Sequence, residues 1–150
     1  MFFREAKPSD FKELHAIRMS VKENVLSNPS LITAEDYEYH VSVLGKGWVC
    51  EIDHIIIGFS IVNLLKNNIW ALFVRPEYEG LGVGKQLHDT MLNWYFSQTK
   101  AAVWLSTQPN SRADGFYRKS GWKATGKDSH GDTIFELTYN DWNKQNKSTI

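Results

Sequence analysis

Three glycines at alternate positions, Gly80, Gly82 and Gly84, form the part of this sequence best suited to bind an anion. They follow the apolar run 69–74 and precede an amphipathic segment that begins at Lys85. Glycine lets the backbone approach a ligand, and the first N–H groups of a helix have no partner within it, so a strand, turn and helix of this kind favour phosphate. The pattern predicts a site for a phosphorylated cofactor.

Two common phosphate-binding motifs do not fit this turn. A P-loop ending in Gly84 and Lys85 needs glycine where the chain has Glu79, and Ser or Thr where it has Gln86. A dinucleotide fingerprint that starts at Gly80 needs its third glycine where the chain has Lys85. The glycines alone therefore leave the identity of the cofactor open.

A second group of residues suited to chemistry lies between 110 and 122 and includes Asn110, Ala113 and Tyr117. Ala113 and Tyr117 are four positions apart, so a helix places them on one face. Asn110 precedes that helix, where its side chain can cap the helix, contact a ligand, or do both. From the residues alone, Tyr117 is interpreted as a core aromatic whose hydroxyl lies at the edge of the core.

Length and composition predict one domain over residues 1–150. Lys plus Arg and Asp plus Glu number 17 each, and the resulting zero net charge argues against nucleic acid as the main partner. Cys50 is the single cysteine, which excludes an internal disulfide and suits a reducing compartment. No signal peptide or membrane-spanning run is recognisable, so we expect a cytoplasmic protein without a membrane partner.

Hydrophobic periodicity and turn residues predict an α/β fold with seven strands and about four helices. A helix connects the fourth and fifth strands, so these should form a central parallel pair in a mixed, otherwise antiparallel sheet. A polar tail from residue 143 is expected to fray. The predicted elements are strand 2–6, a helix from 8 to about 21, helix 34–44 capped by Thr33 and Asp36, strands 48–52 and 55–65 as a hairpin turned at Asp53 and His54, strand 69–74, helix 84–97, strand 101–107, a helix that follows Asn110 and ends near 121, and strands 123–127 and 133–139.

The element order and two motifs resemble the GCN5-related N-acetyltransferases, the GNAT superfamily. The segment 74–84 resembles the acyl-CoA pyrophosphate loop of that family: Gly82 and Gly84 match, whereas Glu79 stands where the family has Arg or Gln. The segment 110–122 resembles the family signature of Asn, Ala, Phe-Tyr, Lys and Gly-aromatic. The resemblance in element order extends from about residue 3 to residue 139.

This resemblance implies acetyl-CoA as the acyl donor, a primary amine as the acceptor, direct attack in a ternary complex, and no metal. It implies that the backbone of Phe73 and Val74 pairs with the pantetheine arm and that Asn110 and Tyr117 contact the cofactor. The pyrophosphate would be held by the backbone N–H groups of Leu81, Gly82, Val83, Gly84 and Lys85.

The resemblance also gives Tyr117 a catalytic role. A phenol with a pKa of about 10 is a weaker acid than a thiol near 8.5, so a hydrogen bond from Tyr117 to the leaving thiolate is favoured over full proton transfer. No carboxylate lies in the strands 69–74 or 101–107, so no general base is evident there. Among the histidines, His40 and His130 lie nearest to the expected acceptor site.

The acceptor, a small-molecule or peptide amine, is expected to contact the first two helices. Carboxylates in that region would attract an ammonium group, although a solvated helix face explains them equally well. A noncatalytic acyl-CoA-binding regulatory module remains the alternative function, because of Glu79 and the missing base. Whether the many aromatic residues line a pocket or a homodimer contact is left open. The polar residues expected near the acceptor are Glu23, Asn24, Glu35, Asp36, Tyr37 and Glu38.

Overall fold

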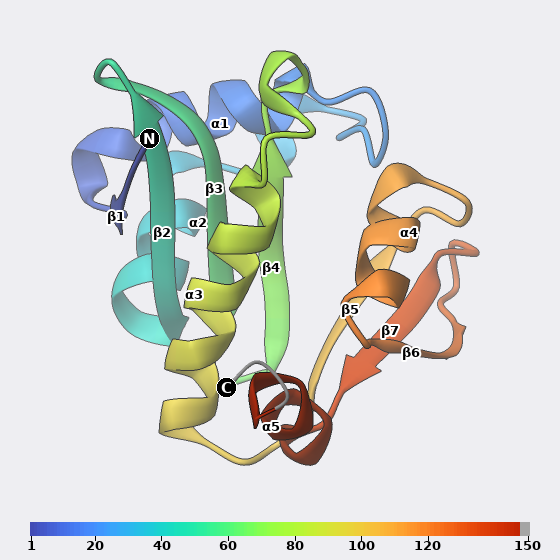
Figure 1. Cartoon of the computed structure of the whole chain (residues 1–150). Helices are drawn as coiled ribbons and strands as arrows, with labels where there is room; N and C mark the ends of the chain where they lie inside the picture. Colours follow the sequence, from blue (N-terminus) through green and yellow to red (C-terminus); the bar gives the residue numbers. More distant parts are fainter. Residues whose placement is uncertain (148–150) are drawn as a thin grey trace. The chain divides into compact units, whose positions relative to one another are not determined.

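The computed structural model of the chain describes residues 1–147, and these form two compact units (Figure 1). Unit 1 is Met1–Tyr95, and unit 2 begins at Phe96. Unit 1 contains β1 (Phe2–Glu5), α1 (Phe11–Ser20), α2 (Ala34–Tyr39), β2 (Gly45–Ile52), β3 (Ile55–Asn63), β4 (Asn68–Val74) and α3 (Val83–Gln98), which continues past the boundary at Tyr95. Unit 2 contains β5 (Val103–Thr107), α4 (Arg112–Lys119), β6 (Lys123–Lys127), β7 (Thr133–Leu137) and α5 (Tyr139–Lys147).

The four strands of unit 1 form an antiparallel sheet in the order β1-β2-β3-β4. The predicted hairpin between β2 and β3 is confirmed: Asp53 and His54 both have positive φ, 51° and 66°, which a tight two-residue turn requires. The register between β3 and β4 shifts opposite Trp70, because Val62 pairs with Ile69 and Ile61 pairs with Ala71. Trp70 is therefore the extra residue of a β-bulge.

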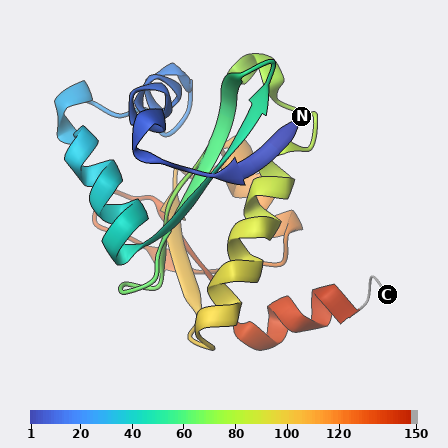
Figure 2. The same ribbon diagram turned by 90° about the vertical axis from the view of Figure 1, so that its left-hand side faces the viewer.

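Helices α1 and α2 lie on one side of this sheet, and α3 lies on the other (Figure 2). Phe11, Leu14 and Ile17 are three positions apart, so they share the face of α1 that turns toward the sheet. Tyr37 adds its ring from α2, and all four side chains are buried in one cluster with Phe59 of β3. This cluster holds the two helices against β3 and β4.

The predicted cap of α2 is confirmed. Thr33 Oγ1 accepts a hydrogen bond from the Asp36 N–H at 3.2 Å, and the Asp36 carboxylate accepts one from the Thr33 N–H at 2.8 Å. Helical backbone extends over residues 34–44 as predicted, but only Ala34–Tyr39 is α-helical and His40–Leu44 forms a π-helical turn. Strand β2 begins earlier than predicted, at Gly45, whose missing side chain lets the backbone of Val62 approach.

In unit 2 the strands are antiparallel in the order β5-β7-β6, with Leu105 opposite Phe135. The strand order of the chain, β1-β2-β3-β4-β5-β7-β6, confirms the predicted mixed, mostly antiparallel α/β fold of seven strands. The expected fraying of the tail from residue 143 is wrong for residues 143–147, which belong to α5 (Tyr139–Lys147); residues 148–150 lie outside the described residues. The buried Trp142 anchors α5, and it packs on Phe96 with ring centroids 6.2 Å apart. None of the helices in the described residues combines the length and apolarity needed to cross a membrane.

Candidate functional site

The glycine turn adopts a conformation that needs glycine but leaves open space above it. Gly80 and Gly82 have φ values of 81° and 83°, in the left-handed region that favours glycine. A Cβ atom built on either would meet no atom within 4 Å, and one on Gly84 would meet only Val74 Cγ2, at 3.7 Å. Close packing against the protein therefore does not explain these glycines, and the turn has room for a ligand.

The turn leads directly into α3. The Gln86 N–H donates to the Gly82 carbonyl oxygen at 3.1 Å, so the helical hydrogen bonds begin at Gly82. The N–H groups of the first turn after Gly82 precede the first possible helical donor and have no acceptor within the helix. Together with the positive end of the helix dipole, they suit a phosphate group.

A groove of about 420 Å³ runs from this turn along α3. Lys85 and Asp89 lie in it and form an ion pair with Nζ and Oδ2 3.0 Å apart. Burial raises the pKa of Asp89, but hydrogen bonds from His88 and Lys85 outweigh this and hold the pKa below its usual value. Lys85 is exposed, so an entering phosphate can compete with Asp89 for its ammonium group. The groove is lined by Gly82, Lys85, Gln86, Asp89, Thr90 and Asn93.

Phe73 and Val74 form the end of β4, as predicted. Phe73 pairs with Phe59 of β3 and Val74 with Gly58. The strand end is held by Arg75, whose N–H donates to the Ile57 carbonyl at 2.8 Å. The sequence did not indicate what lies above Phe73: the guanidinium carbon of Arg18, from α1, is 4.4 Å from the centroid of its ring.

Tyr117 lies in α4 of unit 2 and is buried. Its ring packs against those of Phe116, Trp122 and Phe135, with centroids 5.3, 5.4 and 6.0 Å away. Burial raises the pKa of Tyr117, which keeps its phenol neutral and able to donate a hydrogen bond. The interpretation of the ring as a core aromatic is confirmed, and the role of the hydroxyl stays a prediction.

Of the roles left open for Asn110, the cap of α4 is excluded. Ser111 is the capping residue: its Oγ accepts a hydrogen bond from the Asp114 N–H at 3.2 Å and donates one to the Gln108 carbonyl at 2.6 Å. Asn110 precedes it with φ of 59°, a left-handed conformation that Asn tolerates better than most residues. Its side chain is exposed and is not used by the helix. Contact with a ligand remains the predicted role of Asn110.

Two of the polar residues expected near the acceptor, Asp36 and Tyr37, instead stabilise the fold. The Asp36 carboxylate belongs to the cap of α2. Tyr37 is buried, its hydroxyl lies 3.0 Å from His15 Nδ1, and burial raises the pKa of Tyr37 to about 12. Glu35 and Glu38 are exposed on α2 and remain able to attract a cation.

His40, at the end of α2, is held in a defined orientation. Its Nδ1 lies 2.9 Å from the Asp36 carbonyl oxygen, which can only accept, so Nδ1 carries a hydrogen and, in the neutral ring, Nε2 is the nitrogen with the lone pair. Its ring is stacked on the indole of Trp70, the bulged residue of β4. The i, i+4 spacing of Asp36 and His40 was visible in the sequence, but the contact with Trp70 was not.

The predicted site residues therefore fall into two groups. Phe73, Val74 and the loop Leu81–Lys85 lie in unit 1. His40 and Arg18, also in unit 1, are two further candidate site residues. Asn110 and Tyr117 lie in unit 2. Within the described residues, no three His, Cys, Asp or Glu side chains come together as ligands for a metal ion.

Comparison with known proteins gives the same picture at the level of family and fold. The model of the acetyltransferase (GNAT) family matches residues 11–122. A peptidyl-lysine N-acetyltransferase, YjaB, of Salmonella typhimurium is 35% identical over 74 residues, which span 47% of this chain and 45% of that protein.

Two solved structures illustrate the fold. The PaiA N-acetyltransferase of Thermoplasma acidophilum, in complex with coenzyme A, has a TM-score of 0.78 at 18% identity, and the match covers 92% of this chain and 98% of that one. A GNAT-family acetyltransferase of Staphylococcus aureus has a TM-score of 0.79 at 20% identity, with the same coverage of 92% and 98%.

Proposed function

Because the chain belongs to the acetyltransferase (GNAT) family, we propose that it moves an acetyl group from acetyl-CoA to a primary amine by direct attack in a ternary complex. The observation that carries this proposal is the glycine turn, which is open to a ligand and leads into the N-terminus of a long helix. The coenzyme A bound to the Thermoplasma protein and the lysine substrate in the name of the Salmonella relative support it.

In this proposal, mainly backbone groups of the chain bind the acyl donor, acetyl-CoA. The N–H groups of the loop Leu81–Lys85 bind the pyrophosphate, and the backbone of Phe73 and Val74 pairs with the pantetheine arm. Asn110 contacts the cofactor through a side chain that the cap of α4 does not use. Acetyl-CoA, when bound, supplies the activated thioester, and these residues only bind and orient it.

The acceptor must lose a proton before it can attack. A lysine-like amine with a pKa of about 10.4 is neutral in only about one molecule in 2,500 at pH 7. We propose that His40 removes this proton. Its Nε2 accepts the proton, because Nδ1 already donates to the Asp36 carbonyl. Stacking on Trp70 fixes the plane of the ring. His40 is thus the general base in this proposal.

The leaving group must also be stabilised. Tyr117 donates a hydrogen bond to the sulfur as negative charge develops on it in the transition state. The packing of its ring among three aromatic neighbours fixes the direction of the hydroxyl. The raised pKa of Tyr117 keeps the proton on the phenol, which suits a hydrogen-bond donor better than a full acid.

The alternative, a noncatalytic acyl-CoA-binding regulatory module, rests on Glu79, which stands in the turn where the family has Arg or Gln. One experiment separates the two functions. Acetyl-CoA is incubated with the protein and a panel of primary amines, release of the free thiol is followed, and cofactor binding is measured by calorimetry. Amine-dependent thiol release supports the transferase. Tight binding with no release above the blank supports the module, and no binding contradicts both.

A further inference from the structure

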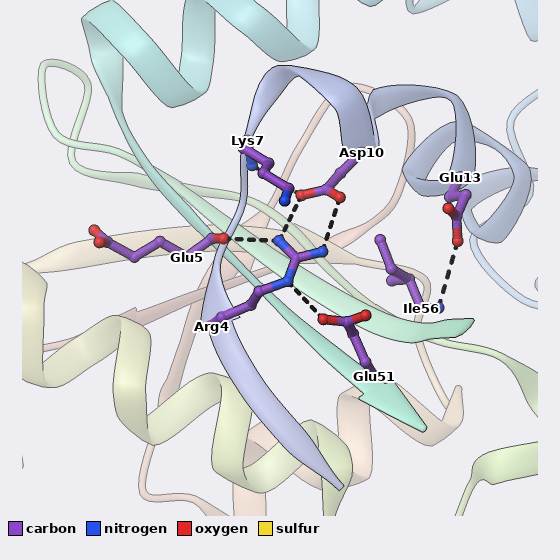
Figure 3. A network of polar contacts seen from close by, with 7 residues as sticks. All are labelled: Arg4, Glu5, Lys7, Asp10, Glu13, Glu51 and Ile56. Atoms are coloured by element: carbon purple, nitrogen blue, oxygen red, sulfur yellow. Dashed lines mark hydrogen bonds and ion pairs between the residues drawn. The ribbon is translucent and has the colours of Figure 1, made fainter. Parts of the chain in front are cut away.

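Two arginines on the α1 side of unit 1 have opposite surroundings, and Figure 3 shows the first of them. Arg4 donates from Nη1 and Nη2 to the two carboxylate oxygens of Asp10, at 2.8 and 2.9 Å, and from Nε to Glu51 at 2.6 Å. The hydrogen bond with Asp10 is the main reason why the pKa of Arg4 is raised. This guanidinium is fully engaged by anions of the protein itself.

Among the described residues, Arg18 has no such carboxylate partner. In the part of the chain that the structure describes, its Nη1 is buried and makes no hydrogen bond. Burial lowers the pKa of Arg18, and the Tyr37 hydroxyl offsets only part of this effect. At Arg4, by contrast, the carboxylates of Asp10 and Glu51 raise the pKa above its usual value. Arg18 as a whole is partly buried. A partly buried cation with an unpaired N–H group and no anion beside it costs stability, and a bound anion would offset that cost.

The geometry of Arg18 limits which group can pair with its guanidinium. Its guanidinium lies over the ring of Phe73 with 4.4 Å between the carbon and the centroid, so the aromatic ring covers one face. The N–H groups of a guanidinium point outward in its plane, and their spacing matches the two oxygens of a carboxylate. Arg4 and Asp10 make that two-point contact in this chain. A carboxylate therefore has the geometry to pair with Arg18 in the same way.

The position of Arg18 relates it to the proposed reaction. Phe73, below it, belongs to the end of β4 whose backbone is proposed to hold the pantetheine arm. Trp70, which carries the His40 ring, lies three positions earlier on the same strand, about 10 Å away at 3.3 Å per residue. The bulge turns Trp70 to the side of Phe73, and both pack on the cluster beneath α1 and α2. The cation and the proposed base therefore face the same side of one strand.

We infer that Arg18 binds a carboxylate carried by the amine acceptor. This inference rests on the proposed function and narrows its substrate class to amines with a nearby carboxylate, such as amino acids or peptides with an acidic neighbour, and away from plain polyamines. Glu35 and Glu38, exposed on α2, remain available to the ammonium group of such a zwitterion. Arg18 acts in specificity and does not take part in proton transfer.

The test compares matched acceptors. One pair is L-lysine and L-lysinamide, which differ in the α-carboxylate; the other is an acetyl-capped Lys-Asp peptide amide and its Lys-Asn counterpart. For at least one pair, wild-type kcat/KM is expected to favour the carboxylate member by about 10- to 100-fold, the range of a charged hydrogen bond. The pair that shows the preference tells whether the carboxylate is that of a free amino acid or of an acidic side chain.

Arg18→Gln should lose this preference while kcat/KM for the amide member changes by less than about threefold. Arg18→Lys, which keeps the charge and loses the planar fork, should retain part of it. Arg4→Gln is the matched control, because it breaks an arginine–carboxylate contact of the fold and should lower stability without changing the preference. Should Arg18→Gln fail to fold, the wild-type pairs and Arg18→Lys still decide the question.

Three results would overturn the inference. They are equal kcat/KM for both members of each wild-type pair, a preference unchanged in both Arg18 variants, and a loss of acetyl-CoA binding in Arg18→Gln, which would assign Arg18 to the cofactor. In the first two, thiol release continues and the transferase function stands. Calorimetry of L-lysine binding in the presence of coenzyme A provides a readout without turnover: Arg18-dependent binding with no thiol release from any amine would keep the carboxylate site and contradict the transferase.

Discussion

The imidazole of His40 lies nearly parallel to the indole of Trp70, with ring centroids 3.9 Å apart and planes 15° apart. The first residue comes from the end of α2 and the second from a bulge in β4, so the contact links a helix end to the strand that carries Phe73 and Val74. Because Nδ1–H donates to the Asp36 carbonyl, Nε2 is the ring nitrogen on which a proton can be accepted. The proposed base thus has a fixed position before any substrate binds.

This arrangement predicts that His40→Gln lowers turnover by about 10²- to 10⁴-fold, the usual contribution of a general base. His15→Gln is the matched control, since His15 contacts the Tyr37 hydroxyl and should affect stability more than turnover. Added imidazole should restore part of the activity of His40→Ala, which loss of packing alone would not allow. Wild-type turnover in His40→Gln, with chemistry rate-limiting, would remove His40 from the mechanism.

The glycine turn predicts that Gly82→Asp abolishes acetyl-CoA binding, because a side chain and a negative charge enter the proposed phosphate site. Gly131→Asp is a close control: both glycines have φ of 83°, and a Cβ on either meets nothing within 4 Å. The two variants should share the cost of a strained backbone, about 1–2 kcal/mol. Calorimetric titration should show binding lost in the first and kept in the second; normal binding in both would contradict the site.

The buried phenol predicts that Tyr117→Phe lowers kcat by about 10²- to 10⁴-fold, with a much smaller change in KM, because the hydrogen bond strengthens only as charge develops on sulfur. Acetyl-CoA binding should survive, and an acyl donor with a better leaving group should recover part of the rate. Tyr95→Phe serves as the control. It removes a hydroxyl that donates to Asn67 Oδ1 at 2.9 Å, so stability should change and kcat should not. Equal kcat in the two variants would remove Tyr117 from the mechanism.

The Arg4–Asp10 contact predicts a pH-dependent contribution to stability. Burial raises the pKa of Asp10, but hydrogen bonds from Arg4 and the Lys7 N–H outweigh it and lower the pKa below its usual value. A carboxyl with a lowered folded pKa stabilises the fold above its unfolded pKa of about 3.9, and this stability is lost as pH falls through the folded pKa. Asp10→Asn should therefore cost about 1.5–3 kcal/mol at pH 7.

The measurement is urea unfolding of wild type and Asp10→Asn at pH 7 and at pH 3. The difference in the free energy of unfolding should shrink at pH 3. Glu5→Gln provides the comparison, because the side chains of the Lys46–Glu5 pair are more exposed and this pair should contribute less than about 1 kcal/mol. A difference for Asp10→Asn that is the same at both pH values would show that its carboxylate charge is not what stabilises the fold.

Several features of the fold and the site depend on neighbours along the chain, and these could be predicted from the sequence. The run 69–74 followed by alternating glycines indicated a strand, a turn and a helix, and left-handed φ at Gly80 and Gly82 bears out the need for glycine. The capping of α2 by Thr33 and Asp36 was visible for the same reason. Such patterns depend mainly on residues close together in the chain, so they can be recognised without knowing which distant segments pack beside them.

Other features were decided by the tertiary structure. Strict alternation in β4 would place Trp70 on the face opposite Phe73, and the bulge that turns it toward His40 arises from pairing with β3. Ser111 caps α4 although Asn110 is an equally good capping residue, because the left-handed backbone at Asn110 moves the start of the helix by one position. Within the described residues, Arg18 has no carboxylate partner while Arg4 has two, although both arginines directly follow apolar residues, Phe3 and Ile17. A side chain's partners depend on which distant strands and helices pack beside it, and short-range sequence patterns carry no information about that.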